Sequence, residues 1–293
     1  MFLPKKTGRE RPVFPAASAE KEVYAGCALT LVGCSKWISE LAARSAVLRE
    51  DNTDTPGPGF RVENIPNPID VSAFYPYDAY QMAQTEDKLG LSPAKFRILF
   101  GAVKLSAKRK GVDFFVEALR MLHGQYPETT ESVELVLFGQ ADEGWFQALP
   151  FKVHYLGTLS GEAALADAYN VSHVFVMPSL EENLPNVIME SLACGTPAVA
   201  FRVGGIPDLI DHRRNGYLAK YMAADDLCRG IHWVWQLYQQ ATPEPTNPAE
   251  TYTRLADEAR RKVLDYFTEE KVSQQYIRLY QDMLTAQNPS RHG

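Results

Sequence analysis

The chain has 293 residues, of which 45% are hydrophobic and 23% charged, a composition typical of globular proteins of one or two domains. Its net charge of −6 weighs against a nucleic-acid partner, because such partners usually require a basic face. No apolar run approaches the ~20 residues of a membrane span, and residues 1–22 lack the apolar centre of a signal peptide. The spacing of Cys27, Cys34, Cys194 and Cys228 predicts neither a metal site nor disulfides, which favours a reducing cytosol.

The first quarter of the chain predicts only part of an α/β domain. Residues 1–22 combine basic residues with prolines, and we expect a disordered tail there, with a membrane-surface arm as the alternative. Within 23–75 the patterns predict a strand over 28–33, a helix over 36–48 capped by Ser35 and a strand over 60–65. Residues 51–59 indicate a loop, and 76–92 indicate a linker that contains one short helix.

Strands and helices then alternate regularly. The strands lack a clean two-residue alternation, as expected where both faces are covered, and repeated βα units predict a doubly wound parallel sheet. We assign 93–266 to this domain and 267–293 to a C-terminal helix and tail. The expected strands are 97–100, 134–138, 153–156, 173–177, 198–201 and 217–219, and the expected helices are 112–124, 161–170, 185–194, 206–211, 224–240, 249–266 and 268–287.

A basic loop follows the first strand of this domain. Lys104, Lys108, Arg109 and Lys110 lie between Gly101 and Gly111, just before a helix. Charge-assisted hydrogen bonds from such cations to a diphosphate contribute about 1.5–3 kcal/mol each. The alternative is a solvated lysine-rich loop, which the position at the ligand edge of the sheet makes less favoured.

Two acids follow the strand over 173–177, with seven residues between them. Glu182 lies in the loop before a short helix, and Glu190 lies within that helix among apolar neighbours. A carboxylate there can hold a ribose diol, although carboxylates on a helix are more often simply solvated. The amides of Asn183 and Leu184, before Pro185 at the helix start, are placed to meet an anion or a sugar oxygen.

A third junction, Gly204-Gly205, follows the next strand. Paired glycines permit a close backbone approach to a ligand, and a plain tight turn is the alternative. The six histidines are scattered without metal-ligand spacing, so no metal and no further cofactor are expected.

These motifs together resemble the C-terminal half of retaining glycosyltransferases of the GT-B fold, family 4 (glycosyltransferases group 1). The resemblance covers about 24–240 and rests on these segments: Pro178-Ser179, the pair Glu182 and Glu190, the run 190–200, Gly204-Gly205-Ile-Pro-Asp208, Arg109-Lys110-Gly111 and 65–70.

The resemblance implies roles for single residues. Glu182 would contact hydroxyls of the donor sugar, Glu190 would hold the ribose, and Arg109 and Lys110 would neutralise the departing diphosphate. Retention would proceed by front-face attack, with a phosphate oxygen taking the acceptor's proton. Ala102 stands where many members have an arginine, which leaves Lys104 or Arg109 to supply the second cation.

The resemblance also implies partners. The donor is a nucleotide-diphosphate sugar, and the acceptor, a lipid-linked glycan being one candidate, belongs to surface or exopolysaccharide synthesis in the cytoplasm or at the inner face of the membrane. Only 24–70 resemble the N-terminal acceptor domain, so either the chain is truncated or a partner chain would supply the other half. The alternatives are a non-catalytic nucleotide-sugar-binding subunit, an inactive fragment or a sugar epimerase. A nicotinamide-dependent oxidoreductase is disfavoured because no Gly-x-Gly-x-x-Gly follows a strand.

Overall fold

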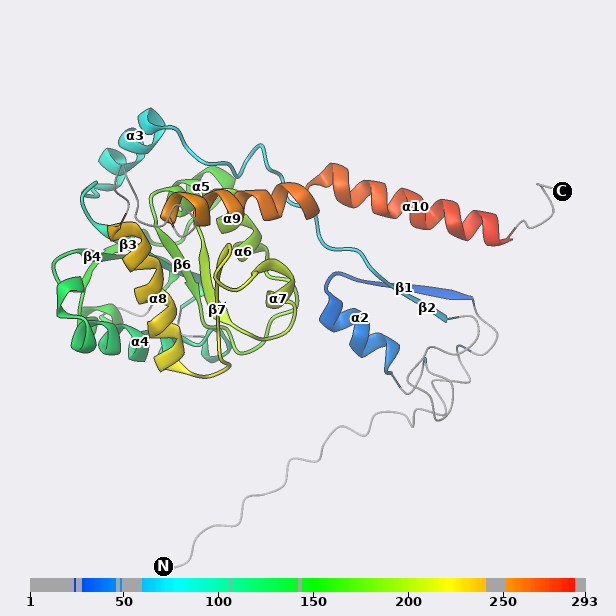
Figure 1. Ribbon diagram of the computed structural model, residues 1–293, viewed down its shortest axis with the longest axis horizontal. Helices are drawn as coiled ribbons and strands as arrows, with labels where there is room; N and C mark the ends of the chain where they lie inside the picture. The colour runs from blue at the N-terminus through cyan, green and yellow to red at the C-terminus, as the bar shows by residue number, and fades with distance from the viewer. Residues whose placement is uncertain are drawn as a thin grey trace, which may run out of the picture. The chain divides into compact units, whose positions relative to one another are not determined.

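The computed structural model describes residues 24, 28–45, 48, 60–105, 107–141, 144–240 and 251–287 (Figure 1). Contacts between Cα atoms divide the chain into two compact units, 1–64 and 65–293. The tail predicted at 1–22, the loop at 51–59 and Cys27 lie outside the described residues. The domain boundaries drawn from the sequence stay predictions.

The first unit is a βαβ arrangement. Strands β1 (Leu29–Gly33) and β2 (Phe60–Asn64) pair in parallel over their whole length. Helix α2 (Lys36–Ala43) starts at Ser35, whose hydroxyl accepts a hydrogen bond from the amide of Ile38 at 3.2 Å. The helix is shorter than the predicted 36–48, because the chain turns after Ala43, with Arg44 as its C-cap.

The second unit contains a six-stranded parallel sheet, and the prediction of a doubly wound sheet is confirmed. The strands lie in the order β5-β4-β3-β6-β7-β8, which is the 3-2-1-4-5-6 order of dinucleotide-binding sheets. The order reverses between β3 and β6, and ligands bind at such a switch point. The strands are β3 (Phe96–Lys104), β4 (Val133–Gln140), β5 (Lys152–Tyr155), β6 (Val174–Met177), β7 (Ala198–Phe201) and β8 (Gly216–Ala219).

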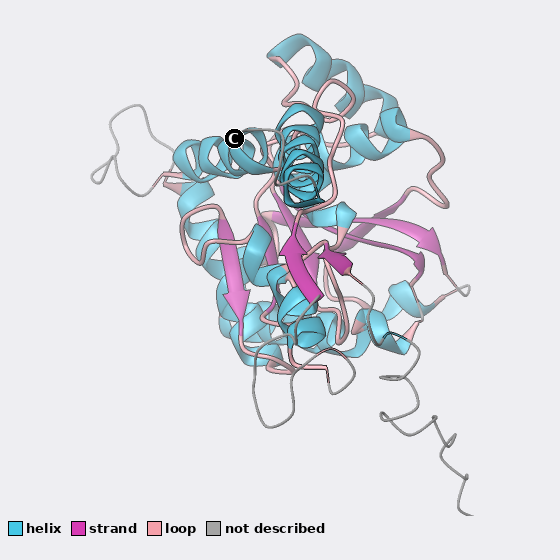
Figure 2. Cartoon of the chain, turned by 90° about the vertical axis from the view of Figure 1, so that its right-hand side faces the viewer, coloured by secondary structure: helices cyan, strands magenta, loops and turns pink. Residues whose placement is uncertain are grey.

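One α-helix of this unit precedes its strands in the chain, others lie between successive strands, and the last three follow the final strand. Figure 2 distinguishes helices from strands by colour. The α-helices are α3 (Ala79–Leu89), α4 (Val112–Gln125), α5 (Glu162–Asn170), α6 (Asn186–Ala193), α7 (Ile206–Leu209), α8 (Ala224–Gln239), α9 (Tyr252–Tyr266) and α10 (Glu269–Gln287), with short 3-10 helices η1 (Lys108–Lys110), η2 (Pro127–Thr129) and η3 (Trp145–Ala148).

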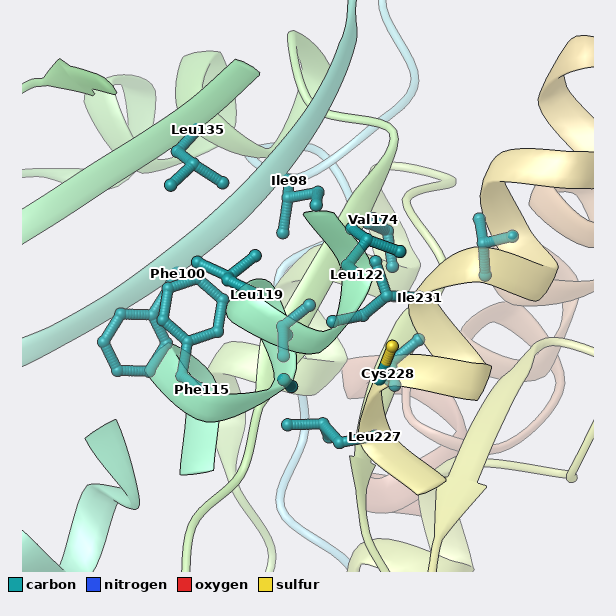
Figure 3. Packing of buried hydrophobic residues seen from close by; sticks show 14 of the residues in the cluster. Ile98, Phe100, Phe115, Leu119, Leu122, Leu135, Val174, Leu227, Cys228 and Ile231 are labelled. Atoms are coloured by element: carbon teal, nitrogen blue, oxygen red, sulfur yellow. The ribbon is translucent and has the colours of Figure 1, made fainter. Parts of the chain in front are cut away.

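The main core lies between the sheet and helices α4 and α8. Figure 3 shows Ile98 and Phe100 of β3 among side chains of α4 and α8. The rings of Phe100 and Phe115 stack with centroids 4.4 Å apart. Strand β3 is buried from Phe96 to Ala102, as expected of a strand covered on both faces, and it is longer than the predicted 97–100 because it continues beside β4 as far as Lys104.

The first residues of the second unit, 65–69, pack against the C-terminal helices. The amide of Ile69 donates to the carbonyl of Phe267 at 2.8 Å, and Ile65 clusters with Val272 and Leu279 of α10. The described cysteines are free thiols, and burial raises the pKa of Cys194 to about 12. None of the helices in the described ranges combines the length and apolar character that a membrane crossing requires.

Candidate active site

Three loops follow β3, β6 and β7 at the carboxyl ends of the parallel strands. Strand β6 lies between β3 and β7 in the sheet, so the loop after β6 has the other two as neighbours. The loops carry almost all of the side chains that the sequence singled out. Because β3 and β6 flank the switch point, this edge of the sheet is where a ligand of such a fold is expected.

Lys110 and Glu182 are brought into contact at this point. The Lys110 ammonium donates to Oε1 of Glu182 in a short ion pair that joins η1 to the loop after β6. Their side chains are only 19% and 12% exposed, so water screens the pair less than it would a surface pair. Two residues predicted to act on one donor therefore share one site.

The backbone fixes the first two loops against each other. The amide of Leu180 donates to the carbonyl of Arg109 at 2.8 Å. Gly111 has φ of 68°, and a Cβ placed there would lie 1.8 Å from the carbonyl oxygen of Pro178. No larger side chain fits without moving one of the loops, which explains the glycine directly after the basic pair.

The third loop is held in the same way. Gly204 has φ of 55°, and a Cβ there would lie 1.7 Å from the carbonyl oxygen of Glu182. The amide of Gly205 donates to the carbonyl of Asn183 at 2.7 Å. Gly204 thus permits a close approach between two loops of the site, beyond what a plain tight turn requires.

Glu190 lies in α6 and faces a buried tyrosine. The hydroxyl of Tyr169, which is fully buried in α5, donates to Oε2 of Glu190 at 2.8 Å. Burial raises the pKa of Glu190, the hydrogen bond from Tyr169 opposes this, and the charge of Glu162 adds to the rise. The carboxylate is held by Tyr169 through one oxygen in a site that resists its ionisation.

The other residues that the sequence predicts for the site differ in their exposure. Lys104 and Arg109 are exposed, and neither has an ion-pair partner within the ranges the structure describes. Asn183 is exposed, whereas the side chain of Leu184 is buried, which leaves only its backbone for a ligand. Helix α6 begins at Asn186 and not at the predicted 185, because Pro185 adopts an extended conformation as N-cap.

Sequence reasoning missed both the tyrosine that holds Glu190 and the long-range polar contacts of Asp167 on the same helix, α5. Tyr169 is a tyrosine in an otherwise ordinary helix, so its sequence context indicates packing. The hydroxyl of Tyr77 donates to Asp167 at 2.8 Å, and Asp167 also pairs with Lys88 at 2.7 Å. These contacts join residues about 80 to 90 positions apart, and no local spacing signals them.

The loop after β5 is joined to the same end of the sheet. The amide of Gly139, at the end of β4, donates to the carbonyl of Gly157 at 2.7 Å, and the hydroxyl of Tyr155 donates to the Gly139 carbonyl at 2.6 Å. Within the described part of the chain, no three His, Cys, Asp or Glu side chains are grouped as metal ligands.

Comparisons with known proteins show which proteins the chain is similar to. Residues 95–236 match the family model "Glycosyl transferases group 1". N-acetyl-alpha-D-glucosaminyl L-malate synthase of Bacillus anthracis is 25% identical over 236 residues, which are 78% of this chain and 55% of that protein. A D-inositol 3-phosphate glycosyltransferase of Jonesia denitrificans is 30% identical over 162 residues, 51% of this chain and 37% of the relative. The chain spans about half the length, or less, of these curated relatives.

Solved structures share the fold. A glycosyltransferase of Rickettsia africae superposes with a TM-score of 0.72 at 16% identity, over 92% of this chain and 68% of that one. Alr3699/HepE of Anabaena in complex with UDP superposes with a TM-score of 0.68 at 18% identity, over 93% of this chain and 70% of that one. The C-terminal domain of the group 1 glycosyl transferase LpcC of Francisella tularensis superposes with a TM-score of 0.54 at 19% identity, over 69% of this chain and 99% of that one. Residues 95–236 therefore belong to the group 1 glycosyltransferases, and the six-stranded parallel sheet that they form is of the GT-B type.

Proposed function

We propose that this chain supplies the donor half of a retaining glycosyltransferase that moves a sugar from a nucleotide-diphosphate sugar to an acceptor. The observation that carries the proposal is the Lys110–Glu182 ion pair at the switch point of the sheet. A cation beside a carboxylate matches a donor in which the diphosphate adjoins the sugar. The group 1 family match and the relative crystallised with UDP-glucose support the same substrate class.

The proposed chemistry follows from where charge develops. When the bond between sugar and diphosphate breaks, negative charge gathers on the leaving diphosphate. Lys110 is fixed at the site by its ion pair, and exposed Arg109 precedes it, so both cations can stabilise that charge without large rearrangement. Glu182 would bind hydroxyls of the sugar, and Glu190 would hold the ribose through the oxygen that Tyr169 leaves unoccupied.

The rest of the enzyme belongs to the proposal as well. The acceptor would bind a second α/β domain, of which unit 1–64 would form part, and a partner chain is one source of the remainder. The acceptor class that we propose is a growing surface glycan, including a lipid-linked one. A non-catalytic nucleotide-sugar-binding subunit would share the donor site but would transfer no sugar in any assembly.

The first test is nucleotide binding by the purified chain. We expect UDP, GDP or ADP to bind, and Lys110→Ala to weaken the preferred nucleotide about tenfold or more, because one charge-assisted contact is lost. Isothermal titration calorimetry measures the affinities. Glu181→Ala, at an exposed position of the loop after β6, is the control and should leave the affinity unchanged. Equal affinity of the Lys110→Ala variant and the parent chain would contradict the assignment of the donor site.

A further inference from the structure

A cavity lies in unit 65–293, and none of the described residues that line it belongs to the donor loops. Its volume is about 400 Å³, and it opens between the turn before β8, the second half of α8 and the start of α9. The residues that line it are Arg213, Arg214, Trp233, Gln236, Leu237, Thr251, Arg254 and Leu255.

The cavity carries a concentrated positive charge. Three of its lining residues are arginines, and none of the described residues that line it is acidic. Arg214 pairs with Glu258 at 2.9 Å, whereas Arg213 and Arg254 have no ion pair with any described carboxylate. In a chain of net charge −6, three guanidinium groups around one hollow are a local exception to the overall charge.

The position of Arg213 is fixed by backbone and aromatic contacts. It has φ of 61°, a left-handed conformation that is uncommon for a residue other than glycine, asparagine or aspartate. Its amide donates to the carbonyl of Gly216 at 2.7 Å. Its guanidinium lies 5.8 Å from the ring of Trp233 and 5.9 Å from that of Tyr217, within the range of cation–π attraction. The arginine is thus held at the cavity wall.

The cavity lies at the amino ends of the parallel strands, opposite to the carboxyl ends where the donor loops lie. Arg213 and Arg214 come just before Gly216, the first residue of β8, and so stand at the amino ends of the parallel strands. Helix α8 starts after the carboxyl end of β8, and Gln236 and Leu237 lie near its far end. Arg254 follows Thr251, whose hydroxyl caps the 15-residue helix α9, and such a helix start favours negative charge.

We propose that this cavity binds a phosphate-bearing ligand at a site separate from the nucleotide-sugar donor. Guanidinium groups are suited to phosphate because their paired N–H donors match its oxygens. The volume exceeds that of a single phosphate and falls within the range of small-molecule sites. The phosphate belongs either to a free small molecule or to a lipid headgroup, and the inference holds whether or not the chain transfers a sugar.

The test uses pyrophosphate and the nitrogen-15-labelled chain carrying Lys110→Gln, so that binding at the donor loops does not interfere. The reporter is the NMR signal of the Trp233 indole N–H, assigned with Trp233→Phe. We expect a saturable shift of this signal and weaker binding as the salt concentration rises. Adding Arg213→Asn and Arg254→Gln should weaken the pyrophosphate affinity about tenfold or more. Asparagine suits the left-handed backbone of position 213.

A second arm distinguishes the two sources of phosphate. The chain is sedimented with vesicles of phosphatidylcholine alone and with vesicles that contain phosphatidylglycerol. Arginine-dependent pelleting with the anionic vesicles but no pyrophosphate shift would assign a lipid headgroup, and the reverse would assign a free phosphate compound. Binding of an acidic peptide in place of both would overturn the proposal.

Arg278→Gln, on the exposed side of α10, is the matched control and should leave binding unchanged. If the double variant fails to fold by circular dichroism, Arg254→Gln alone carries the test, because Arg254 is exposed. Pyrophosphate and vesicle binding that are equal in the parent chain and in folded arginine variants would overturn the proposal.

Discussion

At the scale of single residues, the candidate site contains charges that neutralise each other before any donor arrives. Lys110 and Glu182 are mostly buried and paired, so a diphosphate at the proposed site would have to compete with a carboxylate for the same ammonium group. In the proposed function, Glu182 would therefore have two opposing effects on a donor. It would attract the sugar hydroxyls, and it would weaken the binding of Lys110 to the phosphates.

This opposition predicts an unusual result for Glu182→Ala. We expect the variant to bind UDP more tightly than the parent chain, by about tenfold, because Lys110 loses its competing partner. The affinity for UDP-glucose relative to UDP should fall, since the sugar contacts are lost. Calorimetric titration of both ligands gives the ratio, and Glu181→Ala should leave it unchanged. An equal loss of affinity for both ligands would contradict the role of Glu182 at the sugar.

The ionised carboxylate of Glu190 is expected to lower the stability of the fold while it supports nucleotide binding. Its pKa in the folded chain is raised above 4.5, so the folded state binds its proton more tightly than the unfolded state does. Ionisation of Glu190 therefore costs stability as pH rises through 4.5 and then through the folded pKa. We expect Glu190→Gln to raise the free energy of unfolding at neutral pH, to lose this advantage below pH 4.5, and to weaken nucleotide binding.

The measurement for this prediction is urea unfolding of both chains over a pH series. The glutamine oxygen can still accept the hydrogen bond from Tyr169, so the variant tests charge and not packing. If the difference in unfolding free energy between the parent chain and Glu190→Gln stays constant with pH, the ionisation of Glu190 does not cause that difference.

At the scale of elements, a buried ion pair fixes α3 to the sheet. Arg97 is 2% exposed in β3, and its guanidinium pairs with Glu86 of α3 while also donating to the carbonyl of Ser92 at 2.7 Å. Removing the carboxylate would leave a buried cation unpaired. This ion pair anchors residues 76–92 to the sheet, a segment that the sequence indicates only as a linker with one short helix.

We expect Glu86→Ala to lower the free energy of unfolding by about 3–5 kcal/mol, the usual cost of breaking a buried ion pair from one side. Asp87→Ala is the control, because Asp87 is the exposed neighbour on the same helix. Chemical denaturation of both variants measures the difference. A change in the Glu86 variant as small as that in the Asp87 control would contradict a stabilising role for the pair.

The elements also show what the sequence can and cannot predict. Apolar runs such as Val174–Met177 identify buried strands, and turn residues identify the loops at their ends, so the order of elements follows from local patterns. Element ends depend on tertiary pairing, as at Lys104, where β3 continues because β4 lies beside it. The family resemblance implies that Lys110 and Glu182 act on one donor but not that they form an ion pair, and the contact between Tyr169 and Glu190 has no local signal.

At the scale of the whole molecule, unit 1–64 is small for an independent fold. Its described strands form a two-stranded parallel sheet, and parallel sheets are normally covered on both faces. Val32 is 37% exposed, and Trp37 and Leu41 are 42% and 45% exposed. Exposed apolar side chains beside unpaired strand edges favour association.

We therefore expect the purified chain to self-associate or to bind a complementary domain, as measured by size-exclusion chromatography with light scattering. Trp37→Glu with Leu41→Glu should reduce the association, since the charges would oppose burial of this face. The matched control is Ile277→Glu with Leu284→Glu, at exposed apolar positions of α10. A monodisperse monomer of the unaltered chain would contradict the expectation.

All three loops of the candidate donor site come from within residues 96–219, and the glycines at 111 and 204 lock them to one another. The residues that would bind the leaving group thus lie in one continuous stretch of the chain. A different acceptor-binding portion can then be joined to this stretch without altering it. Chimeras between relatives that recognise different acceptors are therefore best joined upstream of residue 96, where the crossover leaves every one of these interlocking contacts intact.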